Sequence, residues 1–355
     1  MTGVHACGKG RRVIDSTIPD EETLEELLSQ PSDGAIATLG RLAGDLVVLG
    51  VGGKMGPSLA RMARRASQAA GVQRRIIGVA RFTRPGLQDQ LHSWGVETIA
   101  CDLLDAAQVR RLPEAALVVA MTGMKFGATG QEALTWAMNA HVPALICEKY
   151  RTSRIVAFST GNVYGMSPIR LGGSLETDPP QPVGEYSMSC LGRERIYEHC
   201  SRRDSIPLAL LRLNYATEMR YGVLVDLAAR IRAGQAVDLT MGHVNVIWQA
   251  DANAMALCAL EHVACPPLVL NLAGPELLSI RRLAEELGRR LDRPVRFTGH
   301  EADDAFLSNA QRAHRLFGYP RVGVEQMLRW VADWVGRDGP SLGKPTHFET
   351  RDGKF

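Results

Sequence analysis

The sequence lacks the features that would direct it to a membrane, to the secretory pathway or to a nucleic acid. None of its apolar runs approaches the ~20 residues that a membrane helix needs, and no apolar segment of the signal-peptide kind follows its N-terminal arginines. Its 41 basic and 38 acidic residues leave a net charge of +3, which is too balanced for a nucleic-acid-binding face. We therefore expect a cytoplasmic protein that binds neither membranes nor nucleic acids.

Cysteine pairs and repeats are also missing. The seven cysteines include no CxxC spacing, and their odd number in a chain of 355 residues argues against a disulfide scaffold and against a zinc site. No internal repeat or low-complexity tract interrupts a composition that is 45% hydrophobic. At ~150 residues per structural unit the chain has room for two units, so we expect a globular protein with reduced thiols and no metal.

Apolar strands alternate with helix-length segments from residue 45 onward. Short apolar strands, separated by segments long enough for crossover helices, are typical of a parallel sheet with helices on both faces. The predicted strands are Leu46–Leu49, Arg75–Ala80, Val96–Cys101, Ala116–Met121, Arg154–Phe158 and Leu208–Leu213. The sequence therefore predicts an α/β fold built on a doubly wound parallel sheet.

The first of these strands runs directly into the glycine-rich segment GVGGKMGP. Glycines at these spacings permit a tight turn, a close approach of the backbone to a pyrophosphate and close packing of the following helix, whose N-terminus attracts phosphates. A glycine turn without a ligand is the alternative. We favour a Rossmann site for a nicotinamide dinucleotide, held by Gly50, Gly52, Gly53, Lys54, Met55 and Gly56.

Three further parts surround this predicted Rossmann domain of residues 45–213. Residues 1–44 form an N-terminal helical extension, with a helix start at Pro19 and Asp20. Residues 214–340 form a smaller, mostly helical substrate lobe interleaved with the sheet. Its predicted helices are 222–233, 249–262, 279–291, 307–316 and 323–335, and its predicted strands lie near 236–240, 268–273 and 294–297. Residues 341–355 are a polar tail, either loose or strapped across the neighbouring subunit of a homodimer.

The GxxGxxG spacing of the loop resembles that of the extended short-chain dehydrogenase/reductases, the family of sugar-nucleotide epimerases and dehydratases. The resemblance covers roughly residues 45–335. The segment FSTGNVYG is similar to the family's FSSxxVYG and places Thr160 at the catalytic serine or threonine, while Tyr186 in GEYSMSC stands at the catalytic tyrosine. The resemblance implies an enzyme that moves a hydride between a nicotinamide cofactor and its substrate.

Other segments match the same pattern more weakly. Asp102 and Leu103 in CDLLD stand where the family contacts adenine, and Lys125 in AMTGMKFG stands where a lysine lies near the nicotinamide ribose. Glu194 matches a helix glutamate of the family, and Asp251 matches an aspartate before a helix. The structural alternatives are a helix cap for Thr160, a packed tyrosine for Tyr186, a solvated loop for Lys125, a turn for Asn162 and a surface position for Arg220.

The catalytic motif departs from the family at one position. The family has Tyr-x-x-x-Lys, whereas Cys190 stands four residues after Tyr186. A phenol has a pKa of ~10 and needs a nearby cation to act as a base near neutral pH, and a neutral thiol supplies none. Three readings stay open. Lys125 or the positive nicotinamide ring lowers the pKa of Tyr186, or Cys190 is itself a redox or acid–base group, or the protein binds the dinucleotide as a sensor without turning it over.

The substrate side of the sequence favours a small molecule. The family's dehydratases carry an Asp-Glu pair where this chain has Gly161 and Asn162, so elimination is disfavoured. The segment from Arg212 to Asp251 is short for holding a nucleotide diphosphate, which favours a polyol, sugar or sugar acid, with epimerisation as an alternative outcome of the same hydride chemistry. The candidate substrate-binding residues are Asn162, Asn214, Arg220, Tyr221 and Trp248, of which the arginine suits a carboxylate.

The end of the second predicted strand bears on the choice of cofactor. It reads Ala80-Arg81, without the aspartate or glutamate that binds the ribose of NAD. Arg81 suits the 2′-phosphate of NADP, and Lys54 would add positive charge on the same side. Stacking of Arg81 on adenine, with tolerance of either cofactor, is the alternative. We expect NADP, with NAD as the second choice.

Overall fold

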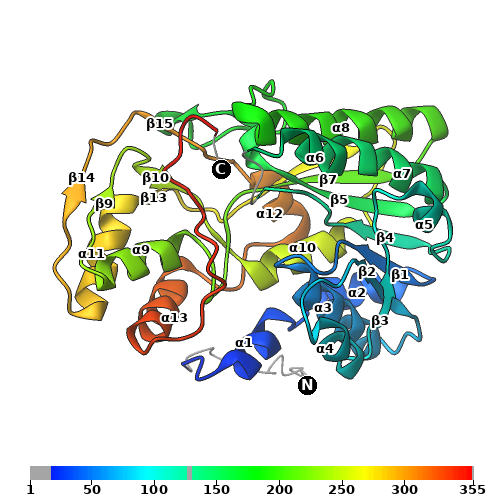
Figure 1. The fold of residues 1–355 in the computed structure, drawn as a ribbon, viewed down its shortest axis with the longest axis horizontal. Coiled ribbons are helices and arrows are strands. Elements are labelled where there is room, and N and C mark those ends of the chain that lie inside the picture. Colours follow the sequence, from blue (N-terminus) through cyan, green and yellow to red (C-terminus); the bar gives the residue numbers. More distant parts are fainter. Residues whose placement is uncertain (1–16, 126–129, 354–355) are drawn as a thin grey trace, which may run out of the picture.

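Seven parallel strands form the central sheet, in the order β12-β7-β5-β4-β1-β2-β3 (Figure 1). The computed structural model describes residues 17–125 and 130–353. The strands of the sheet are β1 (Leu46–Leu49), β2 (Ile76–Ala80), β3 (Glu97–Ala100), β4 (Leu117–Ala120), β5 (Arg154–Thr160), β7 (Leu208–Leu213) and β12 (Leu268–Leu272). All six strands predicted before residue 214 are confirmed, and β5 runs on to Thr160, beyond its predicted end.

Helices cover both faces of the sheet, because the strand side chains alternate between two apolar cores. In β1, Leu46 and Val48 join one core and Val47 and Leu49 join the other. The first core is covered by α3 (Gly56–Ala69), α4 (Leu87–Ser93), α10 (Gln249–Ala259) and α12 (Gln311–Phe317), and the second by α5 (Ala106–Arg110), α7 (Val142–Lys149) and α8 (Gly184–Asp204). The predicted doubly wound α/β fold is confirmed.

The strand order reverses at β1. The strands β2 and β3 lie on one side of it, while β4, β5 and β7 lie on the other, and β1 pairs in parallel with both β2 and β4. In open α/β sheets, ligands bind in the crevice outside the carboxyl ends of the strands at such a reversal. The loops that follow β1, β2, β4 and β5 therefore surround the expected site.

A smaller lobe lies beside the sheet, on the left of Figure 1. Its helices are α9 (Val223–Arg232), α11 (Ile280–Leu291) and α13 (Val324–Gly336), and its strands are β9 (Val237–Asp238), β10 (His243–Val244), β13 (Leu278–Ser279), β14 (Phe297–Thr298) and β15 (Asp304–Ala305). Three elements of the predicted 214–340 segment are interleaved with the sheet. The strand β12 pairs with β7 at the edge of the sheet, and α10 and α12 pack on its face.

The described part of the N-terminal extension holds two helices, in agreement with the helical prediction. The helices α1 (Glu21–Leu28) and α2 (Asp33–Arg41) begin at Asp20 and Ser32, whose side-chain oxygens accept hydrogen bonds from the backbone N–H groups of Thr23 and Ala35. Buried leucines on both helices join the core that α3 and α10 share. The extension is therefore an integral part of the fold.

The chain after α13 returns across the molecule as an extended segment that we call the strap (residues 337–353; red in Figure 1). Phe348 is 2% exposed within the main core, and Arg351 pairs with Asp304. Gly353 lies against the first residue of α8, Gly184. The predicted tail is therefore neither loose nor placed on another subunit, because its buried side chains and ion pairs dock it on its own chain.

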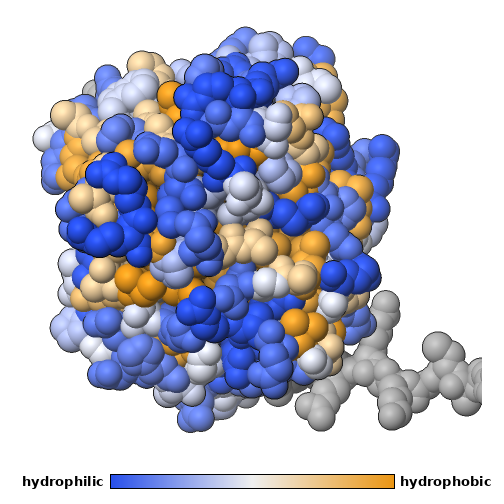
Figure 2. All heavy atoms as spheres, turned by 90° about the vertical axis from the view of Figure 1, so that its right-hand side faces the viewer, coloured by the Kyte–Doolittle hydropathy of each residue, from blue (hydrophilic) through white to orange (hydrophobic). Residues whose placement is uncertain are grey.

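The molecular face on the right of Figure 1 has hydrophilic and hydrophobic residues interspersed (Figure 2). Within residues 17–125 and 130–353, no helix has the length and apolar character needed to cross a membrane.

Candidate active site

The glycine loop forms a cradle that leaves room for a ligand. Gly50 has φ +83°, and a Cβ there would lie 3.1 Å from the backbone of Thr122, whereas a Cβ on Gly56 would lie 2.3 Å from the carbonyl oxygen of Val51. Gly53 is different, because its Cβ would meet only the Gly50 carbonyl oxygen, at 3.4 Å. Two of the glycines are therefore required for close backbone approach, and the third faces open space.

A cavity of about 230 Å³ adjoins this loop at the carboxyl ends of β1, β2 and β3. Asp102 is the carboxylate among the described residues that line it. The lining includes the predicted cofactor residues Gly50, Gly52, Gly53, Arg81, Asp102 and Leu103. A glycine cradle at the strand reversal, continued by this cavity, fits the adenosine half of a nicotinamide dinucleotide.

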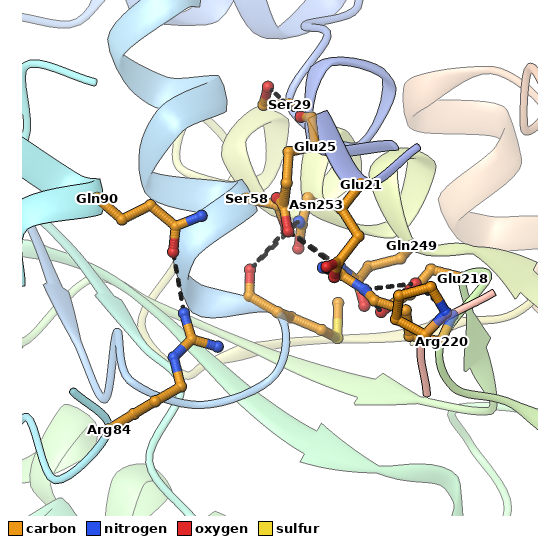
Figure 3. A network of polar contacts seen from close by, with 12 residues as sticks. Glu21, Glu25, Ser29, Ser58, Arg84, Gln90, Glu218, Arg220, Gln249 and Asn253 are labelled. Carbon is orange, nitrogen blue, oxygen red and sulfur yellow. Dashed lines mark hydrogen bonds and ion pairs between the residues drawn. The ribbon is translucent and has the colours of Figure 1, made fainter. Parts of the chain in front are cut away.

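Positive charge at the rim of the cavity comes from the loop after β2. Arg81 and Arg84 both line the cavity and are exposed, and Arg84 donates a hydrogen bond to Gln90 at 3.0 Å (Figure 3). The expectation that Lys54 adds its charge on this side is wrong. Its ammonium lies instead 3.2 Å from the carbonyl oxygen of Ala216, because the side chain extends toward the lobe.

The carboxyl end of β5 supplies Thr160. Its hydroxyl oxygen accepts a hydrogen bond from the backbone N–H of Asn162 at 3.2 Å, so the residue also caps the 3-10 turn that follows (Gly161–Tyr164). Two polar atoms beside it, Nδ2 of Asn162 and Oγ of Ser308, are buried and have no hydrogen-bond partner among the described residues. Buried polar groups are normally paired, so both atoms are available to a ligand at this position.

Tyr186 and Cys190 stand one turn apart near the start of α8. Burial and the neighbouring Cys190 raise the pKa of the Tyr186 hydroxyl well above its usual range, while Arg193 and a hydrogen bond with Thr160 lower it. Burial also raises the pKa of the Cys190 thiol, which is 0% exposed. A neutral, buried thiol is a poor acid–base or redox group, so this geometry disfavours a chemical role for Cys190.

Lys125 approaches the tyrosine from the loop after β4. Its ammonium lies 5.9 Å from the centre of the Tyr186 ring and donates to the carbonyl oxygen of Thr346, on the strap, at 3.4 Å. Burial lowers the pKa of Lys125 to about 8, although the charges of Cys190 and Asp226 act in the opposite direction. Lys125 therefore brings a positive charge to the tyrosine from a different segment of the chain than the family motif would.

Arg193 is a second cation at the tyrosine, and the sequence analysis missed it. It is 6% exposed, donates to the carbonyl oxygen of Phe158 at 3.0 Å and also donates to Oδ1 of Asn139. Asn139 lies in the π-helical turn Ala137–His141 and donates to Ser189 at 2.9 Å, and such turns occur frequently at functional sites. The spacing of seven residues from Tyr186 could have indicated Arg193, because it places both on one helix face.

A buried ion pair between Arg212 and Glu194 lies next to the carboxyl end of β5. Arg212 donates to Glu194 at 2.7 Å, and the hydroxyl of Ser159 donates to the same carboxylate at 2.5 Å. The side chains of the pair are 6% and 3% exposed. The ion pair therefore connects α8, which carries Tyr186, with β7, and the Ser159 hydrogen bond connects the same glutamate with β5, which carries Thr160.

The structure assigns Arg220 to a different task from the predicted one. It forms ion pairs with Glu21, Glu25 and Glu218 (Figure 3), at 3.0, 2.8 and 3.1 Å. These carboxylates raise its pKa and already engage its donors. The prediction that Arg220 holds a substrate carboxylate is wrong, because the guanidinium ties α1 to the lobe.

Two other predicted substrate residues are packed within the protein. Trp248 is 2% exposed and lies against Trp330, with ring centres 5.3 Å apart. Asn214 is buried and donates to the carbonyl oxygen of Phe306 at 3.2 Å. The ring of Tyr221 lies 3.4 Å from the ammonium of Lys54. Trp248 is therefore a core residue rather than part of a substrate pocket.

Comparisons with known proteins agree with this fold. The NAD dependent epimerase/dehydratase family matches residues 46–265, and no curated protein matches the sequence. A solved structure of UDP-glucuronic acid 4-epimerase from Bacillus cereus, in complex with UDP-glucuronic acid and NAD, is 17% identical with a TM-score of 0.67, covering 82% of this chain and 99% of that chain.

Two further solved structures have similar folds. The dTDP-glucose 4,6-dehydratase from Bacillus anthracis, in complex with NAD, is 16% identical with a TM-score of 0.69, covering 83% of this chain and 97% of that chain. The enzyme WbmG from Bordetella bronchiseptica, in complex with NAD and UDP, is 17% identical with a TM-score of 0.69, covering 86% and 99%. The family match spans more than half of the chain, and the protein therefore belongs to the NAD-dependent epimerase/dehydratase family of enzymes.

Proposed function

We propose that the protein is an NAD(P)-dependent oxidoreductase that transfers a hydride to or from a carbinol carbon of a small polyol, sugar or sugar acid. The observation that carries the proposal is the Tyr186 hydroxyl, hydrogen-bonded to Thr160 with Lys125 and Arg193 beside it, at the edge of the sheet where the glycine cradle lies. A nicotinamide dinucleotide held in this cradle supplies the hydride acceptor or donor.

The side chains divide the proton chemistry among them. Thr160 orients the substrate oxygen by a hydrogen bond, and Tyr186 takes the hydroxyl proton in oxidation or returns it in reduction. The raised pKa of Tyr186 keeps the phenol protonated and therefore ready to donate. Lys125 and Arg193 stabilise the phenolate that forms once the proton has left. This division needs no cation at the position of Cys190.

Two features support a small substrate. The segment from Arg212 to Asp251 is short, as noted from the sequence, and the strap fills part of the space between the sheet and the lobe, since Thr346 reaches Lys125. The alternative is a nucleotide-sugar epimerase, because the similar solved structures include a UDP-glucuronic acid 4-epimerase. A sensor that binds the dinucleotide without turnover is the other alternative, and Cys190 at the usual lysine position is the observation that favours it.

The test is a turnover screen on the purified protein. Its absorption spectrum first shows whether reduced nicotinamide is carried along. The protein is then incubated with NAD or NADP and with free aldoses, polyols, sugar acids, UDP-glucose and UDP-glucuronic acid. We expect nicotinamide reduction with one of the free compounds, and at least ~100-fold slower turnover in Tyr186→Phe with dinucleotide affinity retained, which is the usual scale for a general acid or base. Conversion of UDP-sugars alone would favour the epimerase, and dinucleotide binding without any turnover would favour the sensor.

The finer choice of cofactor is proposed to be NADP. Arg81 and Arg84 line the adenosine cavity, and Asp102 is its carboxylate among the described residues. An exposed guanidinium at the end of β2 suits a 2′-phosphate. The dissociation constants of NADP and NAD, measured for the protein and for Arg81→Ala, decide the matter. Tighter binding of NAD by the unmodified protein, or a ratio that the substitution does not alter, would contradict the charge argument.

We propose, as expected from the sequence, that the protein forms a homodimer. Exposed apolar side chains on α6 (Glu132–Trp136) and near the start of α8, among them Trp136 at 36% and Met188 at 40% exposure, offer one candidate contact. The molar mass from light scattering tests it, and a monomer at micromolar concentration would contradict it.

A further inference from the structure

Thr346 lies near the middle of the strap and is 1% exposed. Its backbone N–H and its hydroxyl both donate to one oxygen of Asp226, at 2.8 and 2.6 Å, and Asp226 belongs to α9 of the lobe. The same hydroxyl oxygen accepts the backbone N–H of Phe348 at 3.3 Å, across His347, whose φ of +53° is uncommon for a residue other than glycine. The hydroxyl therefore fixes both the place of the strap on the lobe and the local turn of its backbone.

The carbonyl oxygen of Thr346 reaches the sheet side of the protein. It accepts a hydrogen bond from the ammonium of Lys125, in the loop after β4, at 3.4 Å. That ammonium lies 5.9 Å from the centre of the Tyr186 ring. Although 3.4 Å is long for a hydrogen bond, the acceptor is a backbone atom of a residue that Asp226 holds through two shorter bonds. Thr346 therefore connects a helix of the lobe with a lysine next to the tyrosine.

The ammonium of Lys125 needs such a contact, because the helix that carries the tyrosine does not place it. The family's lysine stands one turn after the tyrosine on the same helix, whereas this chain has Cys190 there. A lysine side chain is flexible, and the effect of its charge on a phenolate falls with distance, so fixed neighbours preserve that effect. Burial lowers the pKa of Lys125, and the charge of Asp226 is among those that oppose this effect. The carboxylate that anchors Thr346 therefore also helps to keep the lysine charged.

We propose that Thr346 is a positioning residue that, together with Asp226, holds the Lys125 ammonium beside the Tyr186 ring, so that the active site is complete only when the strap is docked on the lobe. The inference rests on the proposed function, in which Lys125 stabilises the phenolate of Tyr186. It goes beyond that function because it gives a role in the reaction to a residue of the strap, 221 positions from Lys125 in the sequence.

The first test is a double-mutant cycle on turnover with the best substrate of the screen. Thr346→Val retains the branched shape and the carbonyl group but removes both hydrogen bonds of the hydroxyl. We expect kcat for oxidation to fall at least ~10-fold, the scale of a lost hydrogen bond to a charged group, with KM nearly unchanged, and Thr346→Ser to restore it. In the Lys125→Met background the same substitution should have no further effect, because its action passes through the lysine. Arg351→Met is the matched control, since it removes a different anchor of the strap, the ion pair with Asp304.

A second measurement needs no turnover. Acetylation of Lys125 by acetic anhydride, followed by mass spectrometry as a function of pH, reports the pKa of that lysine. In the unmodified protein the midpoint should lie at about pH 8, because burial lowers the pKa to about 8. In Thr346→Val the ammonium is no longer held in its buried place, so the midpoint should move upward by at least ~1 pH unit, toward the ordinary lysine value. Thr346→Ser and Arg351→Met should leave the midpoint unchanged.

The outcomes separate this inference from the proposed function. An unmoved midpoint in a folded Thr346→Val overturns the inference, as does an equal shift in Arg351→Met or an undiminished loss of kcat in the Lys125→Met background. Where thermal unfolding shows Thr346→Val to be poorly folded, Asp226→Asn takes its place. An upward shift of its midpoint supports the inference, whereas a downward shift, from the lost negative charge alone, overturns it. The expected midpoints in a protein that turns over no substrate support the positioning role and count against the oxidoreductase alone.

Discussion

Replacing Lys125 by methionine tests how the tyrosine is activated without the usual lysine. The ammonium lies 5.9 Å from the centre of the Tyr186 ring. At an effective dielectric constant of about 20, a unit charge at that distance stabilises the phenolate by about 3 kcal/mol, which corresponds to roughly two pKa units. Lys125→Met should therefore raise the pKa of Tyr186 by up to two units and slow oxidation near neutral pH by up to ~100-fold. Activity should not vanish, because the charge of Arg193 remains.

The assay is the pH dependence of kcat with the best substrate of the screen. In the unmodified protein, Lys125 loses its proton as the pH rises through about 8, since burial has lowered its pKa from the ordinary lysine value. The rate of oxidation should therefore stop rising above about pH 8 in the unmodified protein, whereas the rate of Lys125→Arg should continue to rise. Lys149→Met, which removes a lysine of α7 that pairs with Glu114, serves as the control for a lost lysine. The dissociation constant of the dinucleotide shows whether the cofactor site is intact in each variant. An unmoved pH profile in Lys125→Met would refute the electrostatic reasoning and leave Arg193 as the relevant cation.

Four further predictions rest on the geometry of the glycine loop, the Glu194 ion pair and Arg220. Gly53→Asp should abolish dinucleotide binding in a folded protein, because a Cβ fits 3.4 Å from the Gly50 carbonyl oxygen while the added carboxylate repels a pyrophosphate. Gly56→Ala should lower the melting temperature, because its Cβ would lie 2.3 Å from the Val51 carbonyl oxygen. Titration calorimetry measures the dinucleotide affinity of the first variant, and thermal unfolding measures the stability of the second. Normal affinity in Gly53→Asp would show that the cofactor does not bind at this loop. Glu194→Gln should destabilise the fold by about 3 kcal/mol or more in urea unfolding, because it leaves a buried arginine charge unpaired; a loss under 1 kcal/mol would contradict the role of the pair. Arg220→Met should accelerate amide exchange in α1 without changing the KM for a sugar acid, and the opposite pattern would restore Arg220 to the substrate site.

The elements that the sequence predicted well are those specified by local patterns. The strands of the sheet are short apolar runs buried on both faces, so composition alone marks them, and the glycine loop must follow β1 because its φ and spacing requirements are local. The helices after residue 214 were predicted from their apolar spacing, and each is present. What local pattern could not indicate is that β12 joins the central sheet, since strand pairing joins distant segments.

The misassigned and missed site residues depend on long-range contacts. Arg220 and Glu21 are separated by 199 residues, so nothing near the arginine indicates that its charge is neutralised. Asn139 acts from a π-helical turn that no composition rule predicts, and its contact with Arg193 spans 54 residues. Thr160 and Tyr186 were identified because the family motif preserves their local surroundings. Arg193 had a usable local signal in its spacing from Tyr186 on α8. Lys125, the other cation proposed to replace the missing lysine, lies outside that motif, and only the folded chain brings it to the tyrosine.

The strap has a practical consequence for anyone who handles this protein. Gly353 packs against Gly184, two residues before Tyr186 in sequence, and Thr346 contacts the ammonium of Lys125. A peptide fused directly after Gly353 would therefore begin close to the proposed catalytic residues, and removal of the strap would take away the contact with Lys125. Tagging at the N-terminus leaves these contacts intact. A fluorophore on the strap, by the same geometry, would report when the cleft fills or empties.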